Sequence, residues 1–386
     1  MLRPLIAAVL ASLLLGGCAT VSESINKINP WAGKTGPKPT ELQSIKGTAE
    51  ARARWSVNIG KAGNYVFTPA QVDGSVYVAA ADGTLARIDE GAITWRIKAA
   101  PALSAGVGSD GRLVVVGTAK GDVLAFSASD GKPLWQVKVT SEVLAAPTVG
   151  DVGVAVKSGD NRIFLLDAKD GARKWFYQRA TPPLSLRSFA GPVFAEQYVF
   201  AGFPGGKLMA LDAKNGAPIW EGTVALPKGA TELDRVADIV SLPVFDGSQL
   251  CAVAFQGRVA CFDLKQGGQL MWARDFSSTS GLVVDGRYLF TVDAKGAVHA
   301  LERDNGGSVW KQDKLLHRNV SGPAARRNFV AVGDMVGVIH ILRREDGDFA
   351  ARVNTDGTPV LTPLQVMGSG FLVQTAGGTV AAIEVQ

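Results

Sequence analysis

The sequence is poor in the side chains that metal sites and nucleophilic active sites most often need. It has 3 cysteines and 3 histidines in 386 residues, and no two cysteines are adjacent. The histidines, His299, His317 and His340, stand singly. Each is interpreted as a surface or packing residue, so the sequence predicts no metal site, no catalytic residue and no cofactor.

Charge of one sign and long apolar helices are also lacking. Lys plus Arg exceed Asp plus Glu by 40 − 35 = 5, and the basic residues form no block and are not interleaved with aromatics. Nucleic acid is therefore excluded as an expected partner. Apart from the N-terminus, the chain is rich in Gly, Val and Ala and alternates apolar and polar residues, which favours an all-β fold.

The N-terminus predicts export and lipidation. Residues 5–15 are apolar or small, a run too short to span a bilayer but typical of a signal peptide. Leu15-Gly16-Gly17-Cys18 then matches a bacterial lipobox, so residues 1–17 are predicted to be removed and Cys18 to carry the acyl chains. The alternative is an ordinary signal peptide followed by a coincidental cysteine. Ala19, in place of the Asp that retains lipoproteins at the inner membrane, favours the periplasmic face of the outer membrane.

Two segments follow. Residues 18–50 are rich in Pro, Gly and polar residues and are predicted to be a flexible, lipidated tether. Residues 51–386 carry a repeat and are predicted to be one domain.

The repeat is marked by tryptophan. Trp55, Trp95, Trp135 and Trp175 are each 40 residues apart, and Trp220, Trp272 and Trp310 continue the series. A phrase of the form Gly-x-x-x-Trp ends most units, as in Gly131-Lys-Pro-Leu-Trp135. Short strands separated by turns precede each phrase, so every unit holds four strands. Four strands at a period of about 40 residues are typical of a β-propeller.

The number of units predicts how the ring closes. Third strands open at eight positions, namely Gly83, Gly121, Asn161, Gly206, Gly257, Gly296, Gly337 and Gly378. The last unit ends at Gln386 before its tryptophan strand, whereas the strand around Trp55 has no unit in front of it. We therefore expect an eight-bladed propeller of four-stranded antiparallel blades, in which the N-terminal strand completes the last blade. The tryptophans are interpreted as packing between blades and not as a binding feature.

The motif Leu-Asp-Ala-x-x-Gly-x-x-x-Trp, as in residues 211–220, resembles the repeat of quinoprotein dehydrogenases. In that family the motif docks blades and also occurs in members that bind no quinone. The adjacent cysteine pair of the enzymes is missing here. A periplasmic PQQ-dependent oxidoreductase is kept as the alternative function.

Over its full length the chain resembles the BamB family, the lipoprotein subunits of the β-barrel assembly machinery. The resemblance is most specific at Pro183-Leu-Ser-Leu-Arg187, at residues 231–238 and at residues 315–318. It implies a non-catalytic scaffold that binds BamA-like POTRA domains and assists insertion of β-barrel proteins into the outer membrane. The implied contact residues are Leu184, Leu186, Arg187 and Asp238. Val240 departs from the family's second acidic residue and puts that contact in doubt.

Loop length independently marks the same two segments. The links from a tryptophan to the next Pro or Gly marker are longest after Trp175 and Trp220, at residues 176–191 and 221–242. Because these links are consecutive, they are expected side by side on one face of the ring. Leu184 and Leu186 are predicted to face a partner, or alternatively to turn back against the propeller. Extended backbone on this face is also predicted to pair with a strand of the partner or with a strand of an unfolded outer-membrane protein.

Cys251 and Cys261 flank the Gln256-Gly257 turn. A two-residue turn would place them one residue out of register, whereas a three-residue loop or bulge would place them opposite one another. A disulfide and two buried thiols therefore both remain open.

Overall fold

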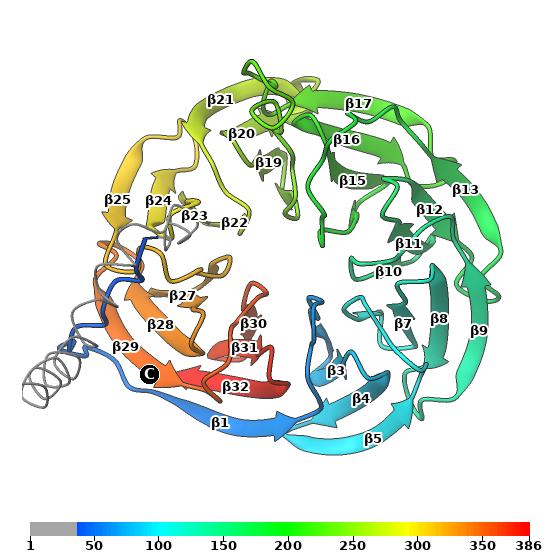
Figure 1. Cartoon of the computed structure of the whole chain (residues 1–386), viewed down its shortest axis with the longest axis horizontal. Helices are drawn as coiled ribbons and strands as arrows, with labels where there is room; N and C mark the ends of the chain where they lie inside the picture. The colour runs from blue at the N-terminus through cyan, green and yellow to red at the C-terminus, as the bar shows by residue number, and fades with distance from the viewer. Residues whose placement is uncertain (1–36) are drawn as a thin grey trace, which may run out of the picture. The chain divides into compact units, whose positions relative to one another are not determined.

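The computed structural model describes residues 37–386, and the predicted signal peptide and Cys18 lie outside this range. Residues Thr40–Gln386 form one compact unit. Its strands are grouped in blades that follow one another around a closed ring (Figure 1). Within residues 37–386, no helix is long and apolar enough to cross a bilayer.

Each blade is a four-stranded antiparallel sheet, and in blades 1–7 the strands lie in chain order from the centre of the ring outward. In the first four, blade 1 is β2 (Ala70–Val72), β3 (Ser75–Ala79), β4 (Thr84–Asp89) and β5 (Ala92–Lys98); blade 2 is β6 (Gly108–Ser109), β7 (Leu113–Gly117), β8 (Asp122–Ser127) and β9 (Pro133–Lys138); blade 3 is β10 (Thr148–Gly150), β11 (Gly153–Lys157), β12 (Ile163–Leu166) and β13 (Arg173–Tyr177); blade 4 is β14 (Val193–Ala195), β15 (Tyr198–Phe203), β16 (Lys207–Asp212) and β17 (Pro218–Thr223).

The next three blades repeat this order. Blade 5 is β18 (Val244–Asp246), β19 (Gln249–Val253), β20 (Gly257–Asp263) and β21 (Gln269–Phe276), with the short 3-10 helix η1 (Leu264–Gln266) before β21; blade 6 is β22 (Leu282–Asp285), β23 (Tyr288–Val292), β24 (Val298–Glu302) and β25 (Ser308–Gln312); blade 7 is β26 (Ala324–Arg326), β27 (Phe329–Gly333), β28 (Val338–Arg343) and β29 (Phe349–Asn354).

Blade 8 joins the two ends of the described chain. It combines β30 (Gln365–Met367), β31 (Gly370–Gln374) and β32 (Thr379–Val385) with β1 (Ala51–Asn58), which pairs antiparallel with β32. The predictions of eight blades and of closure by the N-terminal strand are confirmed. Closure gives β32 a partner along its outer side, where it would otherwise expose an unpaired edge.

The core lies in the middle strands of the blades. Strands such as β3, β7 and β11 are buried along their whole length, because neighbouring blades cover both of their faces. Strands covered on both faces are apolar throughout instead of alternating, which explains runs such as Leu113–Gly117. The outer strands have half-buried and exposed positions, which alternate over much of their length because one face meets solvent.

The tryptophans join each blade to the next, as predicted. In blades 1–6 the indole Nε1 donates a hydrogen bond of 2.7–3.2 Å to a backbone carbonyl of the following blade; the pairs are Trp95–Ala128, Trp135–Ala168, Trp175–Ala213, Trp220–Gly268, Trp272–Arg303 and Trp310–Arg344. The ring also lies on the glycine that opens the next blade's Gly-x-x-x-Trp phrase. A Cβ on Gly216, for example, would be 2.6 Å from the Trp175 ring.

Residues 40–50 form a strap along the outside of blade 7. They were predicted to belong to the flexible tether. The Thr40 amide donates to the Leu316 carbonyl at 3.0 Å, and the Thr48 amide donates to the Ala350 carbonyl at 2.9 Å. In Figure 1 this blue segment passes β25 and β29 before it enters β1. The compact unit therefore includes residues 40–50 as well as the propeller strands.

The disulfide alternative is the one that the structure contains. Cys251 on β19 and Cys261 on β20 are directly opposite in the strand register and are joined, with their Cα atoms 4.1 Å apart. Beyond the last paired residues of β19 and β20, the Ala254 amide donates to the Arg258 carbonyl at 3.0 Å, which leaves a three-residue loop between the strands. Both cysteines are fully buried between blades 5 and 6.

Candidate functional site: two long loops on one face

The two long links lie on the same face of the ring. Every blade has the same strand order, so each link leaves the end of an outer strand and enters the next inner strand on one common side. We define the first loop as residues 178–192, between β13 and β14, and the second loop as residues 224–243, between β17 and β18. They flank blade 4, so both can contact one partner.

The first loop presents one exposed leucine and one exposed arginine. Leu184 is 44 % exposed and Arg187 is exposed, whereas Leu186 is half-buried. The guanidinium carbon of Arg187 lies 5.9 Å from the centre of the Tyr65 ring, a cation–π distance. Leu184 therefore has the predicted outward orientation. Leu186 is only partly exposed, so it matches neither the outward nor the inward orientation fully.

Asp238 does not face solvent. Its side chain is 1 % exposed, and its carboxylate accepts hydrogen bonds from the Leu186 amide at 2.7 Å and the Gly205 amide at 3.0 Å. Its own carbonyl accepts from the Phe255 amide at 2.8 Å. This carboxylate was expected to meet a partner directly. In the free chain it instead joins the second loop to the first loop and to the turn between β15 and β16 of blade 4, while the Asp238 backbone carbonyl joins the loop to the turn between β19 and β20 of blade 5.

The acidic residues of the second loop are likewise engaged within the loop. The Asp234 carboxylate accepts from the Thr231 hydroxyl at 2.7 Å and from the Thr231 amide at 3.1 Å. These hydrogen bonds lower the pKa of Asp234. Glu232 lies 3.6 Å from Arg235 in an exposed ion pair. Such contacts give the loop a defined local shape rather than a free acidic surface.

The exposure of three leucines on the second loop was not predicted from the sequence. Leu226, Leu233 and Leu242 are 58 %, 68 % and 46 % exposed. Each stands alone among polar residues or next to proline, so no periodicity marked it as surface or core. Together with Leu184 they make the two loops unusually apolar for solvent-exposed segments, which is typical of a surface that a partner covers.

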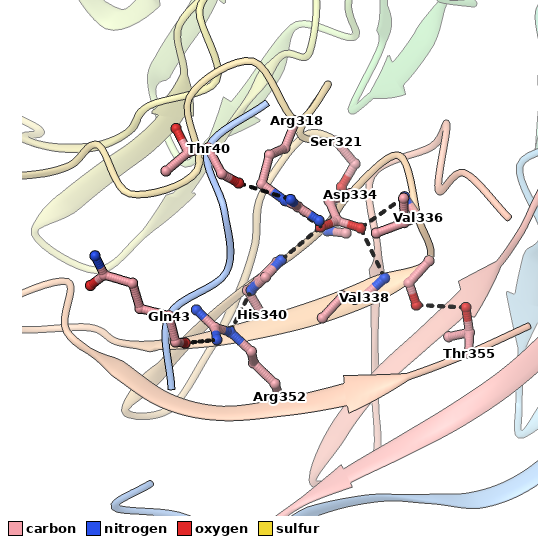
Figure 2. Close-up of polar contacts among 12 residues, drawn as sticks. Thr40, Gln43, Arg318, Ser321, Asp334, Val336, Val338, His340, Arg352 and Thr355 are labelled. Carbon is pink, nitrogen blue, oxygen red and sulfur yellow. Dashed lines mark hydrogen bonds and ion pairs between the residues drawn. The ribbon is translucent and has the colours of Figure 1, made fainter. Parts of the chain in front are cut away.

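The third segment of specific resemblance, residues 315–318, lies under the strap. Arg318 forms a 2.7 Å ion pair with the fully buried Asp334, and it donates to the Thr40 carbonyl of the strap at 2.9 Å (Figure 2). His340 extends the network, with Nε2 3.1 Å from Asp334 and Nδ1 accepting from Arg352 at 3.2 Å. This cluster is a structural fastening of the strap and not an open site.

Burial and pairing set the charges in this network. Burial alone would raise the pKa of Asp334, but hydrogen bonds from His340, the Val338 amide and Arg318 outweigh it and lower the pKa to about 2. Burial lowers the pKa of His340, and the attraction of Asp334 only partly offsets this. His340 is therefore neutral at pH 7, with its proton on Nε2, because Nδ1 accepts from Arg352.

The remaining titratable clusters are small. His299 pairs with Asp293 at 3.0 Å on blade 6, the position that His340 and Asp334 occupy on blade 7. Within residues 37–386, no three His, Cys, Asp or Glu side chains are grouped closely enough to hold a metal ion.

Comparison with known proteins agrees with this architecture. The family model described as "Outer membrane protein assembly factor BamB" matches residues 81–312 and 294–386. A protein of that name from Bordetella pertussis is 40 % identical over 380 residues, which are 98 % of this chain and 96 % of the relative. The chain belongs to the BamB family. The member from Escherichia coli is 32 % identical over 395 residues, covering 98 % of both chains.

Solved structures distinguish family from fold. The crystal structure of BamB from Moraxella catarrhalis has a TM-score of 0.81 and 29 % identity, covering 87 % of this chain and 100 % of that chain. A europium-containing methanol dehydrogenase has a TM-score of 0.71 but only 14 % identity, covering 87 % and 86 %. This BamB-family chain therefore shares with the dehydrogenase only the propeller fold.

Proposed function

We propose that this chain is a non-catalytic scaffold of the outer-membrane β-barrel assembly machinery. It binds BamA-like POTRA domains through the first and second loops and thereby assists the insertion of β-barrel proteins. It is held at the periplasmic face of the outer membrane by acyl chains on Cys18. Membership of a family of outer membrane protein assembly factors supports the general role.

The observation that carries the proposed contact is the joining of the two loops. Asp238 fixes the backbone at Leu186, so Leu184 and Arg187 are presented by a loop that is already ordered. A preformed surface loses less conformational entropy when it binds. Leu184 and Leu186 supply apolar contact, Arg187 supplies a charged anchor, and Asp238 acts from beneath as the residue that positions them.

Client strands are a further proposed partner. Apart from blade 7, where the strap bonds to β29, the outer strand of each blade is paired on one side only, so its free backbone groups can accept an extended segment of an unfolded outer-membrane protein. The oxidoreductase alternative is not favoured, because the dehydrogenases that resemble this chain do so at fold level alone.

The direct test is binding of the mature chain, with Cys18→Ser to keep it in solution, to the POTRA fragment from the same organism. The triple variant Leu184→Ala/Leu186→Ala/Arg187→Ala is expected to bind at least about thirtyfold more weakly, because one truncated anchor costs about 2 kcal/mol. Leu134→Ala is the matched control, since Leu134 is 54 % exposed on β9 and far from the loops in sequence. Equal binding by the triple variant and the wild type would reject this surface.

A further inference from the structure

A buried lysine lies beneath the two loops. Lys157 is the last residue of β11 and is 5 % exposed. Its ammonium donates to the Gly202 carbonyl on the neighbouring blade at 2.7 Å and lies 5.2 Å from the centre of the Phe203 ring. An ammonium has three donors, so one carbonyl and one aromatic ring leave it incompletely compensated. A buried charge in this state needs a counter-charge.

Asp238 is the acidic group whose attraction acts on this lysine. Its carboxylate is buried and accepts two backbone N–H groups, and among residues 37–386 it forms no salt bridge, so the two charges attract one another over a longer distance and not as a contact ion pair. Burial lowers the pKa of Lys157 to about 8, and the attraction of Asp238 is the opposing effect that keeps the ammonium charged at neutral pH. Each of the two groups thus reduces the cost of burying the other.

Lys157 and the second loop also hold the same two residues of β15. Lys157 bonds to the Gly202 carbonyl, and Ile239 packs on Gly202 so closely that a Cβ there would be 2.3 Å from the Ile239 side chain. The Ile239 amide donates to the Phe203 carbonyl at 3.3 Å. Blade 3, blade 4 and the second loop therefore meet at one buried point, directly beside the carboxylate that bonds to the first loop.

We propose that Lys157 is a positioning residue of the two-loop surface: its buried ammonium balances the Asp238 carboxylate and so holds both loops in one arrangement. Without this charge, the carboxylate would gain by turning toward water, and the Leu186 amide would lose its acceptor. The positioning is a property of the free chain. Its consequence for partner binding rests on the proposed function.

Hydrogen exchange at the Leu186 and Gly205 amides tests the positioning, because these two amides bond to Asp238. The mature chain with Cys18→Ser is compared with Lys157→Met, Asp238→Asn and the double variant. Lys157→Met is expected to speed exchange at Leu186 about tenfold or more, as for loss of a charge-assisted hydrogen bond. If Lys157 acts through Asp238, the double variant exchanges no faster than Asp238→Asn alone.

Two results would overturn the proposal. One is unchanged exchange at Leu186 in Lys157→Met, and the other is full additivity of the two substitutions, which would indicate a packing role only. Lys207→Met is the matched control, since Lys207 lies on β16 of the same blade as Gly202 but pairs with Glu221 at 2.8 Å. It is expected to leave exchange at Leu186 unchanged.

A pH series on the unmutated chain covers the case in which Lys157→Met fails to fold. After correction for intrinsic exchange, protection of Leu186 is expected to fall as the pH passes 8, where Lys157 loses its proton. Constant protection up to pH 9.5 would contradict the proposal. POTRA binding is measured separately: loss of Leu186 protection with intact binding would leave the positioning in place and show that binding does not depend on it, whereas failure of the unmutated chain to bind would reject the proposed function alone.

Discussion

The contact between Gly216 and Trp175 shows how a pair of residues sets the distance between two blades. Gly216 has a φ of +74°, in the left-handed region, and the Trp175 ring covers the place where a Cβ would be. Glycine is required twice over, for its backbone conformation and for the close approach of the ring. The same pairing recurs in successive blades, so the sequence phrase Gly-x-x-x-Trp encodes an interface between units and not a unit by itself.

Gly216→Ala is expected to lower the free energy of unfolding by about 3 kcal/mol, through left-handed strain of about 1 kcal/mol and overpacking against Trp175 of about 2 kcal/mol. Urea unfolding followed by tryptophan fluorescence measures this. Gly247→Ala is the control, because Gly247 has a φ of +69° but nothing within 4 Å of its Cβ position. An equal loss in both variants would show that the ring contact contributes nothing.

At the scale of elements, blade 7 lacks the tryptophan contact that joins other blades to the next, and the strap takes the place of this contact. Ala351 stands on β29 where other blades carry tryptophan, and blade 8 has no tight turn between its two outer strands because its outermost strand is β1, which does not follow β32 in the chain. The strap covers this place instead, bonding to the Ala350 carbonyl and leaving a cavity of about 480 Å³ beside Ala351 and Arg352. Arg318 and Arg352 then hold the strap by its backbone carbonyls (Figure 2).

Asp334→Asn is expected to lower the free energy of unfolding by about 3 kcal/mol at pH 7, because Arg318 is left buried without its partner. Asp293→Asn, at the same position of blade 6, is expected to cost less, since its partner there is His299. Equal losses at the two positions would argue against a special role for Arg318.

The pH dependence gives a second readout of the same carboxylate. The Asp334 pKa is about 2 in the folded chain against 3.8 without the fold, so its stabilisation is complete above pH 3.8 and is lost as the pH falls toward 2. Between pH 5 and pH 2 the wild type should lose about 2 kcal/mol more than Asp334→Asn. Parallel pH profiles for the two proteins would contradict the assignment.

At the scale of the whole molecule, the pairing of β1 with β32 closes the ring, together with the packing of blade 8 against blade 1. β1 is the only strand of blade 8 that comes from the N-terminal side of blade 1, and its antiparallel pairing with β32 joins residues 51–58 to residues 379–385. Removal of β1 would expose the outer edge of β32 and would also open the ring. The ring thus depends on a contact between segments at opposite ends of the domain.

A chain that starts at Gly60 is expected to unfold at a temperature lower by about 10 °C or more and to self-associate through the free side of β32. Differential scanning calorimetry and light scattering measure both effects. A chain that starts at Thr40 is the control and should match the mature protein. Restoration of stability by a peptide of residues 40–58 added in trans would confirm the pairing as the cause. A truncated chain as stable as the control would contradict it.

The architecture could be predicted from the sequence, because a propeller is encoded by a repeat. Spaced tryptophans, turn glycines and an unfinished last unit predicted eight blades and closure by the strand around Trp55, and these local signals agree with one another. Link length likewise placed the two long loops next to each other. These features can be predicted from local sequence patterns and from the number and length of the repeats, without knowing where any side chain points.

The roles of the individual site residues depend on tertiary contacts and could not be predicted from the sequence. Asp238 was expected to contact a partner, yet it lies buried because amides from two other segments donate to it. Lys157 ends an ordinary strand, and its importance depends on blade 4 and the second loop. Residues 40–50 have the composition of a tether but are fastened by Arg318 and Arg352. Such contacts join residues far apart in the chain, and their geometry is set by packing, which composition and spacing do not record.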